Sequence, residues 1–187
     1  MSDERLNEEE KQKLLEIVRK TILDKLKKGA IDKEAASSEG LGRPCGAFVS
    51  LHKLGQLRGC IGTFTSPRPL VNTVQEMAIS SSQQDPRFPP VQEEEMKDID
   101  IEISVLSPLR EIKDVDEIEV GRHGIYITKG FYSGVLLPQV ATEYGWDRET
   151  FLDHTCMKAG LPPGSWKEEG VKIEIFEAQV FGEKSEE

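Results

Sequence analysis

The sequence predicts an α+β protein built from two lobes, on three observations. Residues 7–28 carry apolar side chains every three or four positions, as a covering helix does. Glycine-containing turns at Gly55 and Gly130 each separate two strand-like runs, and a helical segment follows each hairpin. Residues 99–105 alternate apolar and polar side chains, as a half-buried strand does. We therefore expect mostly antiparallel sheets made of hairpin-then-helix units with covering helices.

The composition is that of a soluble globular protein. The chain has 187 residues, of which 37% are hydrophobic and 31% charged. No apolar run approaches the ~20 residues of a membrane span. The first ten residues are acidic and polar, so we expect no signal peptide. A net charge of −10 disfavours general binding to nucleic-acid phosphates.

The cysteine pattern indicates reduced thiols. Cys45, Cys60 and Cys156 are odd in number and lack Cys-x-x-Cys spacing, which argues for a cytosolic protein and against disulfides or a zinc knuckle. The three histidines are scattered, and no metal-binding, nucleotide-binding or nucleophile-elbow motif occurs. We expect no metal site and no cofactor.

The first lobe begins with the helix 7–28. Asn7 can cap it, with Glu10 completing a capping box, and Gly29 can end it. A hairpin follows, with strands over 47–52 and from Gln56 onward. Pro67 and Pro69 then open a helix that continues to about Ser82.

After this helix, prolines stiffen the loop 85–90, which presents Asp85, Arg87 and Phe88. Two interpretations stay open. The loop is either part of a site, because loops often carry function, or a stiff connector with an internal Asp–Arg pair.

The second lobe repeats the pattern. Its hairpin spans 124–137, helices cover 139–144 and 148–159, and a final strand covers 172–181. The spacing of Gly55 and Gly59 matches that of Gly130 and Gly134. The shared glycines therefore point to structure, and the residues that differ are better candidates for function.

The stretch 56–64 is the strongest candidate site. In a strand, Arg58 and Cys60 point to one face with Cα atoms ~6.6 Å apart, opposite an apolar face. Gly59 and Gly62 reduce bulk beside the thiol, as where a ligand or a backbone comes close. Arg58 would favour a thiolate. The alternative is that Cys60 is a core residue and Arg58 an ion-pair partner.

Other residues can be assembled around this strand. His123 is either a base for Cys60 or a hydrogen-bonded turn residue. If the loop 85–90 covers the strand, Asp85 neutralises only one of the two arginines, Arg58 and Arg87. The remaining positive charge would draw an anionic ligand.

The six residues Leu57–Gly62, Leu-Arg-Gly-Cys-Ile-Gly, strongly resemble the hallmark of the AMMECR-type domain family, whose bacterial and archaeal members are called AmmeMemoRadiSam system protein A. The resemblance covers nearly the whole chain. It continues through residues 46–49, 85–88, 103–108, 120–124, 136–141, 146–147 and 158–161.

The resemblance implies an α+β fold in two unequal subdomains with a cleft between them. It implies one domain over 6–183, followed by an acidic tail at 184–187. It also implies a genomic association with a Memo-like protein and a radical S-adenosylmethionine protein. The short acidic chain suits a prokaryotic, cytoplasmic member. The resemblance supplies no reaction.

We carry three hypotheses. The first is a binding or accessory protein that holds a small anionic ligand or a partner segment in a cleft formed by Arg58, Cys60, Asp85, Arg87 and His123, with Gly59 and Phe88 beside them. The second is an enzyme that uses Cys60 as a nucleophile for acyl or group transfer, activated by Arg58 and with His123 as a further candidate for its base. Nucleic-acid binding ranks third, because of the charge.

Overall fold

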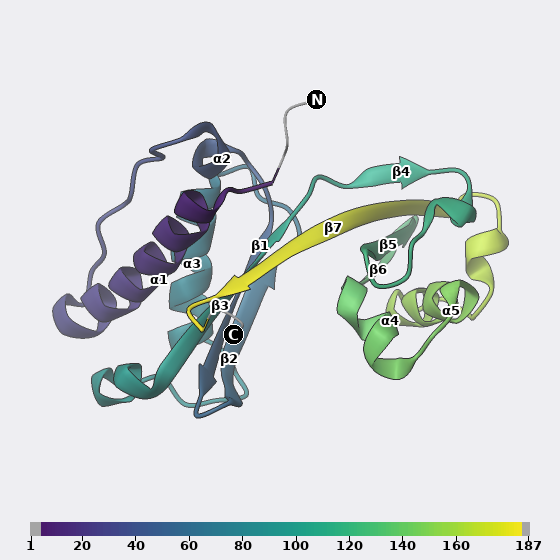
Figure 1. Cartoon of the computed structure of the whole chain (residues 1–187). Helices are drawn as coiled ribbons and strands as arrows, with labels where there is room; N and C mark the ends of the chain where they lie inside the picture. The colour runs from purple at the N-terminus through teal and green to yellow at the C-terminus, as the bar shows by residue number, and fades with distance from the viewer. Residues whose placement is uncertain (1–4, 185–187) are drawn as a thin grey trace. The chain divides into compact units, whose positions relative to one another are not determined.

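The computed structural model describes residues 5–184, and its contacts divide the chain into two compact units. The first unit runs up to residue 106 and includes the chain from 179 onward, whereas the second comprises residues 107–178. Figure 1 follows the chain by colour. Both units contain helices and antiparallel strand pairs, so the predicted α+β class is confirmed.

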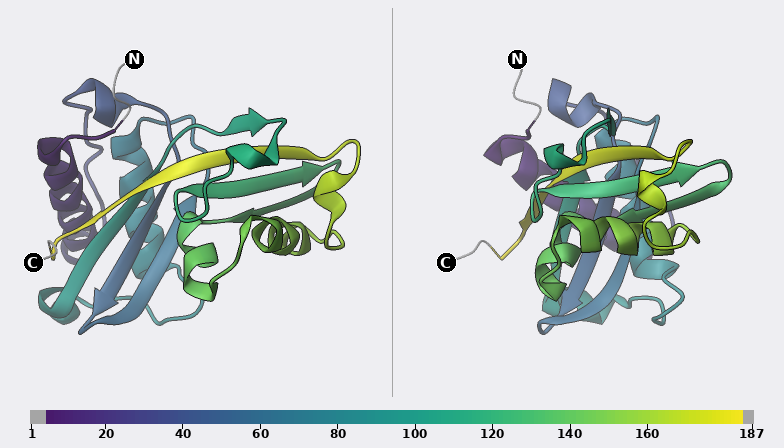
Figure 2. Two further views of the ribbon diagram at one scale, coloured as in Figure 1. Left: turned by 45° about the vertical axis from the view of Figure 1, so that its right-hand side comes forward. Right: turned by 90° about the vertical axis from the view of Figure 1, so that its right-hand side faces the viewer.

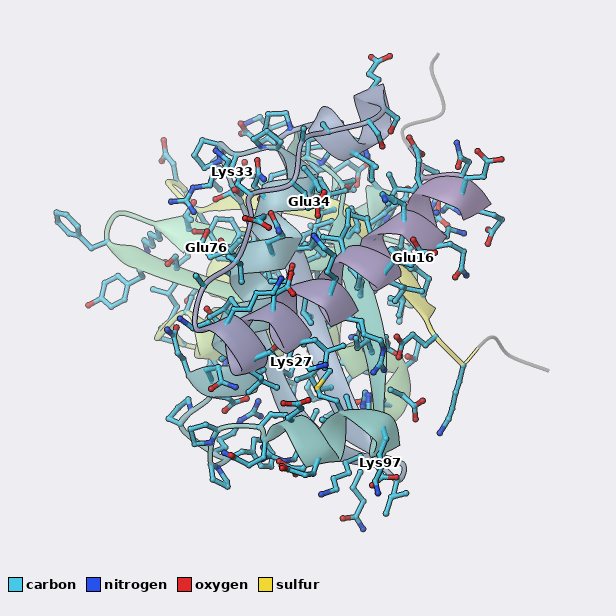
Figure 3. The ribbon with its side chains drawn as sticks, turned by 90° about the vertical axis from the view of Figure 1, so that its left-hand side faces the viewer. Glu16, Lys27, Lys33, Glu34, Glu76 and Lys97 are labelled. Atoms are coloured by element: carbon cyan, nitrogen blue, oxygen red, sulfur yellow. The ribbon has the colours of Figure 1, made fainter. Side chains whose placement is uncertain are left out.

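Helix α1, Glu8–Lys28, begins and ends where the sequence predicts. Asn7 caps it by accepting a hydrogen bond from the third helical residue, whose side chain accepts one from the Asn7 backbone. Gly29 ends it in the left-handed conformation, with φ at 71°. Charged side chains such as Glu16 and Lys27 lie on its outer side (Figure 3).

The sheet of the first unit contains β1 (Ala47–Lys53), β2 (Gln56–Thr63) and β3 (Ile99–Leu106) in the order β2-β1-β3, and the end of β7 (Lys172–Gly182) follows β3. β2 is therefore an edge strand. The other elements of this unit are α2 (Glu39–Gly42), α3 (Leu70–Gln83) and the 3-10 helix η1 (Glu93–Asp98).

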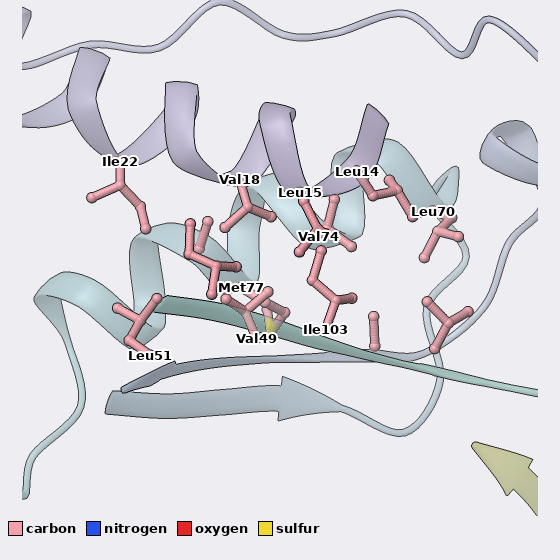
Figure 4. Packing of buried hydrophobic residues seen from close by; sticks show 14 of the residues in the cluster. Leu14, Leu15, Val18, Ile22, Val49, Leu51, Leu70, Val74, Met77 and Ile103 are labelled. Carbon is pink, nitrogen blue, oxygen red and sulfur yellow. The ribbon is translucent and has the colours of Figure 1, made fainter. Parts of the chain in front are cut away.

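The core of the first unit lies between one face of this sheet and the helices α1 and α3 (Figure 4). The residues labelled there are Leu14, Leu15, Val18, Ile22, Val49, Leu51, Leu70, Val74, Met77 and Ile103. On β1, buried positions alternate with the partly exposed Phe48, Ser50 and His52. β3 shows the predicted alternation over its first five residues. The opposite face of the sheet therefore carries polar side chains on β1 and β3, together with the aromatic ring of Phe48.

The second unit pairs its strands in the order β4-β7-β5-β6, and its two helices pack on β5 and β6 (Figure 2). Its elements besides β7 are β4 (Arg110–Ile112), η2 (Val115–Glu117), β5 (His123–Lys129), β6 (Tyr132–Leu136), α4 (Pro138–Tyr144), α5 (Arg148–Lys158) and η3 (Ser165–Lys167). Cys156 on α5 is fully buried, as the sequence predicts.

The two hairpins use their second-strand glycines in the same way. A Cβ at Gly59 would lie 2.2 Å from the carbonyl oxygen of Ser81 in α3. A Cβ at Gly134 would lie 2.3 Å from the backbone nitrogen of Ala159, just after α5. In both units the glycine lets the backbone of a later helix come close to the hairpin. The structural interpretation of these two glycines is confirmed.

The short elements β4, η1, η2 and η3 are not predicted from the sequence. Each has three to six residues, which is too few to show a periodic pattern. Among the helices of residues 5–184, none combines the length and the apolar character that crossing a bilayer requires.

Candidate functional site

The Leu57–Gly62 motif lies on β2, which has a neighbouring strand on one side only. At Cys60 the main chain on the open side is paired with side chains instead. Asp85 Oδ2 accepts a hydrogen bond from the Cys60 amide at 2.9 Å, and Arg87 Nη2 donates one to the Cys60 carbonyl oxygen at 3.2 Å. Asp85 and Arg87, which we call the edge clip, thus take the place of a neighbouring strand.

The edge clip is itself tightly bonded. Asp85 Oδ1 accepts hydrogen bonds from the Arg87 backbone amide at 3.1 Å and from Arg87 Nε at 3.0 Å. Asp85 Oδ2 accepts one from Arg87 Nη2 at 2.8 Å. The hydrogen bond with Arg87 holds the pKa of Asp85 far below its usual range, against the effect of burial, and the Cys60 amide lowers it further. The Arg87 guanidinium also lies 5.5 Å from the centroid of the Phe88 ring. The loop therefore has the predicted internal pair and lies against β2 beside Cys60.

The guanidinium of Arg58 is bound by groups other than the thiol. Its guanidinium donates to Glu95 at 3.1 and 3.0 Å and to the Pro89 carbonyl oxygen at 2.9 Å. Lys53 donates to the same carboxylate at 2.9 Å, and the hydrogen bond with Arg58 is the main reason that the pKa of Glu95 falls to about 2. The prediction that Asp85 neutralises one of two otherwise unpaired arginines is wrong for Arg58, because Glu95 is its partner.

A β-bulge explains the error. The β1–β2 register shifts between Leu51 and His52, so that Leu51 pairs with Gly59 and His52 pairs with Leu57. Arg58 has no opposite residue and falls outside the simple alternation.

The glycines of the motif accommodate protein atoms. Gly59 faces the backbone of α3, as described above. A Cβ at Gly62 would lie 2.2 Å from the Phe48 ring, which packs edge-on against Phe64 at 5.0 Å between ring centroids. The predicted close approach is therefore real, and at Gly59 the approaching group is a helix of this chain.

The Cys60 side chain is partly exposed and has a polar neighbour. Ser50 Oγ donates a hydrogen bond to Cys60 Sγ at 3.1 Å. Arg87 is the cation held beside this residue, through its hydrogen bond to the Cys60 carbonyl oxygen, and the hydrogen bond with Asp85 raises the pKa of Arg87. Cys45 and Cys156 are buried, and burial raises the pKa of both. Cys60 is the accessible thiol of the three.

Comparison with known proteins confirms the resemblance. The family model named AMMECR1 matches residues 15–181. This chain belongs to the AMMECR1 family. Protein MK0488 of Methanopyrus kandleri is 44% identical over 193 residues, covering 98% of this chain and 93% of that protein. Protein MJ0810 of Methanocaldococcus jannaschii is 51% identical over 146 residues, covering 74% of this chain and 73% of that protein.

A solved structure has the same fold as this chain. The crystal structure of the uncharacterised protein PH0010 from Pyrococcus horikoshii has a TM-score of 0.79 and 43% identity. The match covers 91% of this chain and 90% of that one. The fold of this AMMECR1 chain is thereby confirmed as α+β.

His123 of this AMMECR1 chain lies in the second unit and is engaged locally. Its Nδ1 accepts a hydrogen bond from the Glu119 amide at 3.0 Å, so Nδ1 carries no proton. Its Nε2 lies 4.0 Å from a Glu177 oxygen. Burial lowers the pKa of His123, and the positive charge of Arg122 lowers it further. The hydrogen-bonded turn is confirmed, whereas a role as base for Cys60 stays a prediction.

Sequence reasoning missed Glu95 and Ser50 as neighbours of the AMMECR1 motif. Glu95 lies in a run of three glutamates that shows no periodic signal. A regular hairpin around Leu54 and Gly55 would place Ser50 opposite Gly59. The bulge instead places Ser50 opposite Cys60.

Two hollows in the AMMECR1 chain lie away from the motif. One, of about 420 Å³, is lined by residues of the second unit that include Ile112, Trp166 and Ile173. The other, of about 290 Å³, lies beside Glu10 and Ser38 in the first unit. Over residues 5–184, no three His, Cys, Asp or Glu side chains are placed to hold a metal ion. The cleft and pocket expected at Cys60 stay predictions.

Proposed function

We propose that this chain is a binding protein whose ligand contacts the exposed side of the edge clip, beside the Cys60 side chain. The observation that carries the proposal is the state of Arg87. Its Nε and Nη2 are held by Asp85 and by the Cys60 carbonyl oxygen, and its Nη1 has no partner among residues 5–184. The Arg87 side chain is 55% exposed, whereas the Asp85 side chain is 2% exposed.

This arrangement supports an anionic ligand. A guanidinium that is already fixed loses little conformational entropy when it binds, and its planar donors match carboxylate or phosphate. The ion pairs along the open edge of β2 join three cations, Lys53, Arg58 and Arg87, to two carboxylates, Asp85 and Glu95, which leaves one positive charge in excess along this edge of a chain of net charge −10. That local excess supports an anion at this place.

A thermal-shift screen of carboxylates, phosphate esters and nucleotides tests the proposal. A ligand at ten times its Kd adds about 1.4 kcal/mol to the free energy of unfolding. We expect the Arg87→Gln variant to lose that shift. The matched control is Arg68→Gln, because Arg68 is 59% exposed and is paired with Glu76 in the same unit. A ligand that stabilises the wild type and Arg87→Gln equally would refute a role of Arg87.

The anionic group can belong to a small molecule or to a protein segment. The Memo-like and radical S-adenosylmethionine proteins associated with the family are the protein candidates. Co-purification of the three proteins, with the wild type and with Arg87→Gln, tests this source. Retention of a partner by the wild type and its loss in the variant would support a protein segment.

The second candidate function is an enzyme with Cys60 as its nucleophile. The specific observation is the partly exposed thiol itself, which accepts a hydrogen bond from Ser50 Oγ and belongs to the residue whose carbonyl oxygen binds Arg87, whereas Cys45 and Cys156 are buried. Brief labelling with limiting iodoacetamide at neutral pH, read by mass spectrometry, should modify Cys60 before Cys45 or Cys156. Preferential labelling of a buried thiol would contradict this candidate.

A further inference from the structure

Titratable side chains gather on the face of the first unit's sheet that points away from α1 and α3. They come from three adjacent strands and are all partly exposed: Cys60 on β2, His52 on β1, and Asp100 and Glu102 on β3. The strand registers fix how they are arranged.

Two neighbouring rows cross the strands. In the first, Ser50 is paired with Cys60 on one side and with Glu102 on the other. In the second, His52 is paired with Asp100. Directly opposed side chains have Cβ atoms ~4.5–5.5 Å apart, and diagonal neighbours are ~7–8 Å apart. His52 is two residues from Ser50 on the same face of β1, and the β-bulge lies between the two rows, so His52 and Cys60 come from adjacent strands and share one face of the sheet.

Among the three histidines, His52 is the one whose ring has no interaction partner in the part of the chain that the structure describes. Over residues 5–184 it makes no hydrogen bond, ion pair or ring contact. In contrast, His123 accepts a hydrogen bond from a backbone amide, and the His154 ring stacks on Trp146 with centroids 3.8 Å apart. A partly exposed imidazole without a partner is available to exchange a proton.

The surrounding charges favour transfer of a proton from the thiol to the imidazole. On the thiol side, the Ser50 hydroxyl donates a hydrogen bond to Sγ, and Arg87 donates one to the carbonyl oxygen of the same residue. On the other side, the carboxylate-bearing Asp100 is the register partner of His52 on β3, and Glu102 is that of Ser50. Lys184, which forms an ion pair with Asp100, offsets the charge of that carboxylate in part.

We propose that His52 is the proton acceptor of Cys60. The inference rests on the second candidate function, in which Cys60 is a nucleophile. The thiol proton moves to a ring nitrogen of His52, and Sγ attacks the carbonyl carbon of an activated acyl group. A thioester forms as the bond to the leaving group breaks, and the leaving group takes the proton from His52. Asp100, opposite His52, is a positioning residue for the imidazolium.

The pH dependence of Cys60 alkylation tests the inference on the full chain. Iodoacetamide labelling rates are measured at each cysteine by mass spectrometry from pH 6 to pH 9. A free cysteine with a pKa of about 8.5 loses more than about a hundredfold of its thiolate over this range. We expect the wild-type rate at Cys60 to fall by less than about tenfold, because His52 takes the proton.

The variants separate the possible outcomes. His52→Asn should restore the hundredfold fall, Asp100→Asn should give an intermediate fall, and His154→Asn should behave as the wild type does. Far-UV circular dichroism checks folding, and Asp100→Asn keeps the test decisive if His52→Asn does not fold. If the pH profile of His52→Asn is the same as that of the wild type, the role of His52 is refuted. If His52→Asn does not fold, an unchanged pH profile in Asp100→Asn refutes that role. If Cys60 in the wild type is labelled more slowly than the buried Cys45 and Cys156, the hypothesis that Cys60 is a nucleophile is refuted.

Discussion

The tight packing around the two glycines of the motif predicts a graded loss of stability when each is replaced by alanine, and a third glycine outside the motif serves as the control. An added Cβ at Gly59 would lie 2.2 Å from the Ser81 carbonyl oxygen, about 1 Å closer than two non-bonded atoms tolerate. Ser81 lies inside α3, so relief requires the helix and β2 to move apart. We expect Gly59→Ala to cost about 2–3 kcal/mol, near the upper end for overpacking.

The second variant meets a side chain instead of a backbone. A Cβ at Gly62 would lie 2.2 Å from the Phe48 ring. That ring can turn away, at the cost of a poorer rotamer and of its edge-on contact with Phe64. We expect Gly62→Ala to cost about 1–2 kcal/mol, less than Gly59→Ala.

The third variant is the control. The nearest atom to a Cβ at Gly42 is the Ala36 Cβ at 3.4 Å, which is an ordinary contact. Gly42→Ala should be neutral or should gain about 0.4–1 kcal/mol from a less flexible unfolded chain. Urea unfolding followed by far-UV circular dichroism measures all three variants. Fluorescence is less suitable, because both tryptophans lie within residues 107–178. A wild-type unfolding midpoint for Gly59→Ala would refute the close-approach argument.

Two further predictions concern other strained or buried positions. Leu54 is 76% exposed and has a φ of 51° before Gly55. Asparagine tolerates this left-handed conformation better than leucine does, so Leu54→Asn should raise the free energy of unfolding by up to about 1 kcal/mol in the same urea assay. A lower free energy of unfolding would show that the leucine side chain stabilises the turn. Burial lowers the pKa of His123 below the value of about 6.5 in the unfolded chain, so this group's contribution is complete above pH 6.5 and is lost as the pH falls toward the folded pKa. The free energy of unfolding should change by at most about 1.4 kcal/mol per pH unit because of this group. His123→Asn, which keeps an acceptor for the Glu119 amide, should make this pH dependence weaker. If the pH dependence is unchanged in the variant, it arises from other groups.

The sequence by itself determined the elements whose signals are local. Asn7 and Gly29 mark the ends of α1 because capping depends on residues within one turn of each other. Gly59 and Gly134 were recognised as structural because each occupies the same place in its hairpin. The Asp–Arg pair of the loop 85–90 was predictable, because its two residues are neighbours in the chain.

The tertiary structure alone decided the partners that meet across long stretches of chain. Arg58 binds Glu95, 37 residues away, and an ion pair of that separation leaves no periodic trace in a sequence. The bulge beside His52 adds one residue to β2 without any change in the apolar pattern, so alternation alone placed Arg58 next to Cys60. Ser50 became the neighbour of the thiol for the same reason, because a shift of one residue in register changes which side chains are opposed.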